Sequence, residues 1–181
     1  MADVMRKLTV ILAADVAGYD RLVAADADGT FATLRTLRTE LVNAVIATTR
    51  GRILKTSGNA MLIEFRTVRD ALACAVGVQR GVAKRNEDTG PDTRVEFRVG
   101  IHFGDVLIGR GGELSGEAID VAEALEAVCD PAGIRLSRAA HDAVEGKTAE
   151  HFIDCGEVAL MDGAAPMRVF AVEMRGSHIP A

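Results

Sequence analysis

The stretch Arg52–Phe65 constrains the fold more than any other part of the sequence, because two apolar runs flank the short segment Ser57-Gly58-Asn59-Ala60. Glycine and asparagine tolerate the positive φ angles that a tight turn between antiparallel strands requires. The pattern therefore predicts a β-hairpin. Its tip would display the side chains of Lys55 and Asn59 at the edge of a sheet.

A continuous apolar run, Leu8–Val16, precedes the hairpin in the chain. Such a run predicts a strand that is buried on both faces. Asp15 stands near the end of this strand. Because a lone buried carboxylate is costly, we expect Asp15 to have a partner or a metal ion.

The rest of the chain alternates between helical and strand patterns, read from apolar spacings of three to four residues or of two residues. The expected helices are 20–27, 28–50, 68–84, 115–129 and 137–144, and the expected strands after the hairpin are 94–103, 106–108, 134–136, 152–160 and 167–174. Gly104-Asp105 is predicted to turn the chain and form a second hairpin. Gly51 is predicted to end the helix 28–50 in the usual C-terminal manner. The tail 175–181 is predicted to be loose.

This order of elements has a βαββαβ unit at its centre, which is the ferredoxin-like arrangement. The sequence shows neither an internal linker nor a repeat. We therefore predict an α+β fold with a ferredoxin-like core and extra C-terminal strands, formed as a single domain over residues 1–181.

Composition excludes several classes of function. The net charge of −5 argues against nucleic-acid binding, which needs a basic face. No run of about 18 apolar residues predicts a membrane span, and the N-terminus lacks the apolar core of a signal peptide. Cys74, Cys129 and Cys155 are odd in number, which predicts structural free thiols in a reducing cytoplasm. No cysteine or histidine motif indicates a zinc site.

Three ordered motifs then suggest a family. They are Leu12–Tyr19 (LAADVAGY), Gly51–Gly58 (GRILKTSG) and Phe97–Val106 (FRVGIHFGDV). With them, the chain resembles the class III adenylate/guanylate cyclase catalytic domain over about residues 6–174. The resemblance implies a homodimer with active sites between the subunits. It also implies two divalent ions, Mg²⁺ or Mn²⁺, that activate the ribose 3′-hydroxyl of ATP or GTP for attack on the α-phosphorus.

The resemblance assigns expected roles to five positions. Asp15 matches the first metal-binding aspartate, whereas Asn59 stands where the second metal-binding aspartate is expected. Lys55 matches the lysine that reads adenine, and Glu113 falls at the second base-reading position. Arg98 is expected to face the phosphates. For each of these residues a plain structural role, such as a turn residue or a solvated strand residue, remains the alternative.

Three further positions depart from the family pattern. Asp120 replaces an asparagine that positions the ribose, Ala124 replaces an arginine that stabilises phosphate charge, and Met161 replaces a phosphate-binding lysine. These substitutions and Asn59 predict a pseudo-cyclase that dimerises, and binds a nucleotide or a partner, with impaired or absent cyclase activity. The alternative is an active but divergent adenylate cyclase, in which Asp120 recruits a metal ion and Arg110 replaces the missing arginine. The third hypothesis is that the same fold carries a different chemistry or binds a different ligand.

Overall fold

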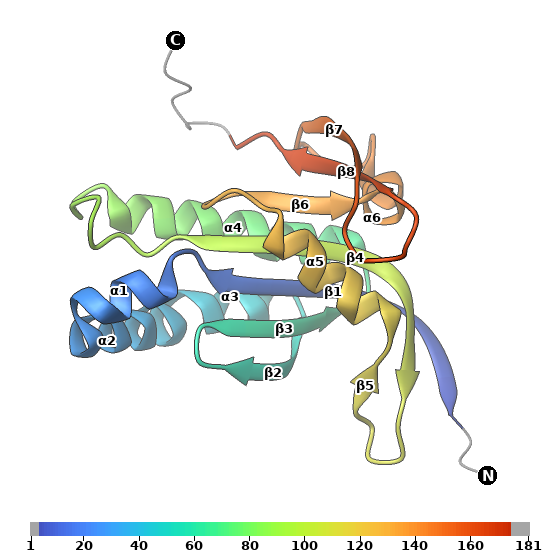
Figure 1. Ribbon diagram of the computed structural model, residues 1–181, viewed down its shortest axis with the longest axis horizontal. Helices are drawn as coiled ribbons and strands as arrows, with labels where there is room; N and C mark the ends of the chain where they lie inside the picture. Colours follow the sequence, from blue (N-terminus) through green and yellow to red (C-terminus); the bar gives the residue numbers. More distant parts are fainter. Residues whose placement is uncertain (1–3, 175–181) are drawn as a thin grey trace.

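The computed structural model describes residues 4–174, so the predicted loose tail lies outside the described residues. In this part of the chain a single sheet has the strand order β2-β3-β1-β4-β6-β8-β7, and β5 pairs with β4 (Figure 1). The strands are β1 Met5–Val16, β2 Arg52–Ser57, β3 Ala60–Phe65, β4 Phe97–Ile108, β5 Leu114–Ser115, β6 Ile134–Ser137, β7 Phe152–Val158 and β8 Met167–Val172. The helices are α1 Tyr19–Ala25, α2 Ala27–Leu37, the π-helical turn η1 Arg38–Val42, α3 Asn43–Thr48, α4 Val68–Asn86, α5 Glu117–Ala127 and α6 Arg138–Val144.

The α+β prediction and its ferredoxin-like core are confirmed. Strands β2, β3, β1 and β4 lie in that order, which is the order of a split βαββαβ unit. β1 pairs antiparallel with both β3 and β4, while β6 pairs parallel with β4 and connects the core to the C-terminal strands. The hairpin β2–β3 lies at one edge of the sheet, as the sequence predicted.

The predicted second hairpin at Gly104-Asp105 is wrong. β4 runs without a break through both residues, and its whole length pairs with β1, from Val16 opposite Phe97 to Met5 opposite Ile108. The long β1 strand offers a partner for every residue of β4, so a turn at Gly104 would forfeit the rest of the ladder. The chain reverses later, where the Gly109 N–H donates to the Glu113 carbonyl at 2.9 Å.

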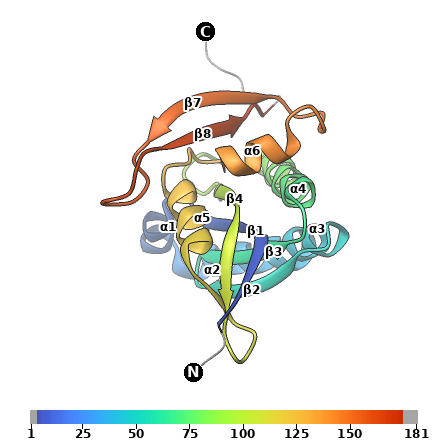
Figure 2. The ribbon, with the colours of Figure 1, turned by 90° about the vertical axis from the view of Figure 1, so that its right-hand side faces the viewer.

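The two faces of the sheet are covered differently. Alternate residues of β1, such as Val10 and Leu12, pack against the layer formed by α2, α3 and α4. The intervening residues, such as Ile11 and Ala13, pack against α5 on the opposite face. Figure 2 shows α5 and α4 on opposite sides of β4. We call these two surfaces of the sheet the helix-layer face and the α5 face.

Gly100 permits the close approach of α5 to β4. A Cβ atom at this position would lie 2.4 Å from the carbonyl oxygen of Ala122 and 2.5 Å from the amide nitrogen of Glu126. Any side chain larger than hydrogen would therefore push α5 away from the sheet. This contact fixes how near the α5 side chains come to those of β1 and β4.

The helical segment after α1 is less regular than predicted. Residues 27–48 form α2, η1 and α3 in succession, with the π-helical turn at Arg38–Val42. At its end, Arg50 rather than Gly51 takes the left-handed conformation, with φ of 62°. Gly51 is needed for space, because a Cβ there would lie 2.8 Å from the ring of Phe65.

Within the described residues, no helix is both long and apolar enough to cross a bilayer. Cys74 and Cys129 are buried free thiols, as predicted, whereas Cys155 is exposed.

Candidate functional site

Asp15 lies at the C-terminal end of β1, directly opposite Arg98 of β4. Arg98 donates from Nε to Oδ1 at 2.9 Å and from Nη2 to Oδ2 at 2.6 Å, so both carboxylate oxygens are engaged. The hydrogen bonds to Asp15 hold the pKa of Arg98 above its ordinary value. The partner that a buried carboxylate requires is thus an arginine of the same chain.

Glu126 of α5 completes this group. Its Oε1 lies 3.2 Å from Arg98 Nη2, and the side chain is 12% exposed. Nevertheless, Oε1 has no hydrogen bond of acceptable geometry within the described part of the chain. Burial, together with the neighbouring Asp15 carboxylate, raises the pKa of Glu126 to about 8. Glu126 was not among the residues predicted for the site, because its contact with Arg98 depends on how closely α5 approaches β4.

Asn59 at the tip of the hairpin does not have the positive φ angle that its place in the predicted turn suggested. Gly58 takes the left-handed conformation with φ of 52°, whereas Asn59 does not have a positive φ. The Asn59 carbonyl accepts from the Val16 N–H at 3.2 Å, which ties the tip to the end of β1. Among residues 4–174 its side-chain amide makes no hydrogen bond. The amide therefore has no role in forming the turn.

Lys55 lies on the exposed strand β2, on the side of the hairpin that faces α5. A pocket of about 260 Å³ opens there, and its lining includes Lys55, Ser57, Ala60, Glu123 and Glu126. The ammonium group of Lys55 thus borders the same pocket as two acidic side chains of α5, Glu123 and Glu126. This pocket and the Asp15–Arg98 pair share Glu126, so the structure brings Lys55 and Asp15 into one region.

The other predicted positions are more scattered. Asp120 is exposed on the first turns of α5, Ala124 is half-buried one turn later, and Glu113 is exposed in the β4–β5 loop. Met161 packs against the apolar cluster of Val121, Leu125 and Val169. A methionine in that cluster is explained by packing alone. Neither Glu113 nor Met161 borders the Lys55 pocket.

The residues present do not fit a site for two divalent ions. Hard cations favour carboxylate oxygens, and Mg²⁺ is usually held by one or two carboxylates together with substrate phosphates and water. Both oxygens of Asp15 are occupied by Arg98, and Asn59 offers a neutral amide. The guanidinium of Arg98 already supplies the positive charge beside Asp15, where a metal ion would otherwise lie.

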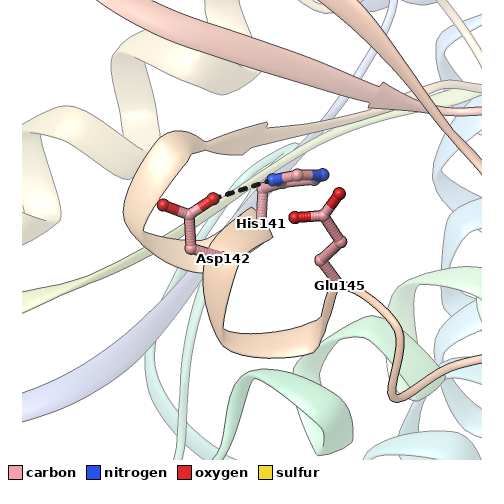
Figure 3. A group of neighbouring side chains, drawn as sticks. All are labelled: His141, Asp142 and Glu145. Carbon is pink, nitrogen blue, oxygen red and sulfur yellow. Dashed lines mark hydrogen bonds and ion pairs between the residues drawn. The ribbon is translucent and has the colours of Figure 1, made fainter.

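A second group of polar side chains lies on and just after α6. One ligand atom each of His141, Asp142 and Glu145 lies within 4.8 Å of the others (Figure 3). His141 is buried, with its ring stacked on Phe170 at 3.7 Å, and its Nδ1 lies 3.1 Å from Asp142 Oδ1. Packing and one hydrogen bond to Asp142 explain this histidine, so we assign no metal to the group.

Comparison with known proteins shows the family to which the fold belongs. The family model described as "Adenylate and Guanylate cyclase catalytic domain" matches residues 4–174. A protein of Rhizobium meliloti (strain 1021), provisionally named adenylate cyclase 3, is 32% identical over 167 residues. The match covers 92% of this chain but 28% of that relative, so the chain spans little more than a quarter of its length.

Two solved structures illustrate the structural likeness. The crystal structure titled adenylate/guanylate cyclase/hydrolase from Silicibacter pomeroyi is 35% identical, with a TM-score of 0.87 over 94% of this chain and 98% of that one. The guanylate cyclase domain of RhGC from Catenaria anguillulae, solved with GTP, has a TM-score of 0.79 at 17% identity, over 94% and 99% of the two chains. The second likeness shows the fold alone.

Proposed function

The chain belongs to the adenylate and guanylate cyclase catalytic domain family, and we propose that it is a member whose cyclase activity is impaired or absent. It would act by forming a homodimer and binding a nucleotide such as ATP. The observation that carries the proposal is the state of Asp15, whose two oxygens are both bound by Arg98. With Asn59 at the second expected metal position, too little negative charge remains to hold two divalent ions.

The positions that are expected to contact the ribose and the phosphates support the same proposal. Ala124 and Met161 carry no charge to offer a phosphate, and Met161 is engaged in apolar packing. Losing one preorganised donor to a developing anion costs on the order of 10²–10³ in rate. Asp120 would add a negative charge beside the phosphates. Because both halves are altered in each subunit, a symmetric homodimer would contain no complete active site.

Lys55 and the pocket beside it favour retained nucleotide binding. The pocket of about 260 Å³ is open on the α5 face, next to strand β2 at the edge of the sheet. A partner subunit placed over this face would enclose the pocket. An ammonium group at its border would donate hydrogen bonds to a purine ring. The three free cysteines favour a reducing compartment, so we place this function in the cytoplasm.

A divergent but active adenylate cyclase is the second candidate, and one observation favours it. The Oε1 atom of Glu126 is buried beside Arg98 without a hydrogen bond. Glu126 could therefore replace the carboxylate that is missing at Asn59 if Arg98 turned toward a substrate phosphate. The exposed Arg110 would then supply the positive charge that is absent at Ala124.

A direct assay separates the two candidates. Purified protein is incubated with ATP or GTP and with Mg²⁺ or Mn²⁺, and cyclic nucleotide is measured, while calorimetry measures nucleotide binding in parallel. The proposal expects nucleotide binding without cyclic product. Cyclic product that disappears in the Asp15→Ala variant would instead establish the active enzyme. Absence of both binding and product would reduce the function to dimerisation.

A further inference from the structure

A cavity of about 330 Å³ lies on the helix-layer face, on the opposite side of the sheet from the Lys55 pocket. Its walls come from the β1–α1 connection, α2, η1 and the hairpin tip. Its polar lining consists of Arg35, Arg38, Asn59 and Gly58, and its apolar lining consists of Val16, Tyr19, Phe31, Leu34, Val42, Met61 and Phe97. The volume is at the lower end of the range for pockets that hold small molecules.

The charge at this cavity is positive and uncompensated. Arg35 and Arg38 are three residues apart on a continuous helical segment, so both side chains project on one side of it. Within residues 4–174 neither guanidinium forms an ion pair or a hydrogen bond, and no acidic side chain lines the cavity. The free side-chain amide of Asn59 lies at the same cavity. These three groups can donate to an anion.

The interior of the cavity is apolar. A smaller cavity of about 40 Å³ adjoins it and shares Val42, Asn59, Met61 and Phe97. Apart from Asn59, the smaller cavity is lined by apolar side chains of β1, β3, β4, α4 and η1. A ligand that fits both parts would have one anionic end and a hydrocarbon body.

The local backbone gives a second reason to regard the cavity as a site. The π-helical turn Arg38–Val42 begins at one lining residue and ends at another. Turns of this kind are rare and frequently lie at functional sites. Here the turn places a charged residue at the polar part of the cavity and Val42 at its apolar part.

From these observations we propose that the cavity binds a small amphipathic carboxylate. The carboxylate group lies between Arg35, Arg38 and the Asn59 amide, and the hydrocarbon body contacts Met61 and Phe97. The ligand touches both the end of β1 and the hairpin tip from the side opposite Asp15. Of the residues that line this cavity, only Met61 also borders the Lys55 pocket. Occupation of the cavity would steady both segments that flank Asp15.

The test uses octanoate as the probe and the methionine methyl groups as reporters. Protein labelled with ¹³C at the methionine methyls is titrated with octanoate, and the Met61 resonance is assigned by the Met61→Leu variant. Met61 should shift in a saturable manner, whereas Met161 and Met167, which belong to another cluster, should not. Calorimetry should give a dissociation constant below about 1 mM.

Charge controls make the result decisive. Arg38→Gln should weaken octanoate binding about tenfold and the more exposed Arg35→Gln about threefold, in keeping with charge-assisted and exposed hydrogen bonds. Arg66→Gln removes the same charge at the other end of β3 and should change nothing. The proposal is overturned if octanoate leaves Met61 unmoved, if octylamine shifts Met61 as strongly, or if Arg38→Gln and Arg66→Gln bind octanoate equally well.

Discussion

His102 offers a sharp test of the electrostatics of this fold. The residue lies on β4, on the α5 face, and its Nδ1 is 2.7 Å from Ser137 Oγ. Burial lowers the pKa of His102 to about 4, from an ordinary value of 6.5. The folded protein therefore keeps this imidazole neutral at pH values where the unfolded chain protonates it.

The size and sign of the effect follow from linkage. The shift of about 2.5 pKa units corresponds to about 3 kcal/mol, at roughly 1.4 kcal/mol per unit. Above pH 6.5 His102 is neutral in both the folded and the unfolded state, so it does not change the free energy of unfolding. Below that pH the unfolded state binds an extra proton. The free energy of unfolding then falls as pH decreases from about 6.5 to about 4.

Urea unfolding at several pH values measures this contribution. The His102→Gln variant keeps a hydrogen-bonding side chain opposite Ser137 but removes the titration. Between about pH 7.5 and pH 4, the wild-type protein should lose about 3 kcal/mol more than this variant. Carboxylates such as Glu64 titrate in both proteins and cancel in the difference. Equal losses in the two proteins would refute the reasoning, since His102 would then be charged in the folded state.

Three further changes test the packing and the charge pairs, each by urea unfolding. Gly100→Ala should lower the free energy of unfolding by about 1–3 kcal/mol because α5 must move, whereas Gly90→Ala, in open space, should stay within about 0.5 kcal/mol. Arg98→Met should cost about 3 kcal/mol by leaving Asp15 uncompensated, and adding Asp15→Asn should recover part of that loss; a larger loss in the double variant would contradict the pairing. Glu64→Gln should cost about 1–3 kcal/mol at neutral pH, where this buried carboxylate accepts hydrogen bonds from Thr9 and Arg52. Since these partners and Lys7 lower the pKa of Glu64 against the opposing effect of burial, the cost should shrink as pH falls below about 4.5.

Much of the fold was predictable because local pattern and tertiary structure agree. The apolar run ending at Asp15 and the hairpin Arg52–Phe65 form the strands that their residues predict. The predicted turn at Gly104 is wrong, although glycine is a common turn residue. There, pairing with β1 outweighs the local preference, and a Cβ would lie 2.6 Å from the His102 ring.

The candidate site was less predictable because it depends on which face each side chain occupies. Asn59 was explained by a positive φ that only Gly58 adopts. Arg98 was expected to face phosphates, yet its closest partner is Asp15, a contact set by the register of β1 and β4. Glu126 joins them only because Gly100 lets α5 approach the sheet. No local sequence pattern reveals these contacts.

The central proposal is that cyclase activity is impaired or absent, and that four substitutions rather than a changed fold are responsible. The most direct measurement is cyclic nucleotide formation from ATP with Mn²⁺ by the variant that combines Asn59→Asp, Asp120→Asn, Ala124→Arg and Met161→Lys. We predict no product from the wild-type protein and clear product from this variant, abolished again by Asp15→Ala. Product from the wild-type protein that needs Asp15, or a folded variant that makes none, would contradict the claim.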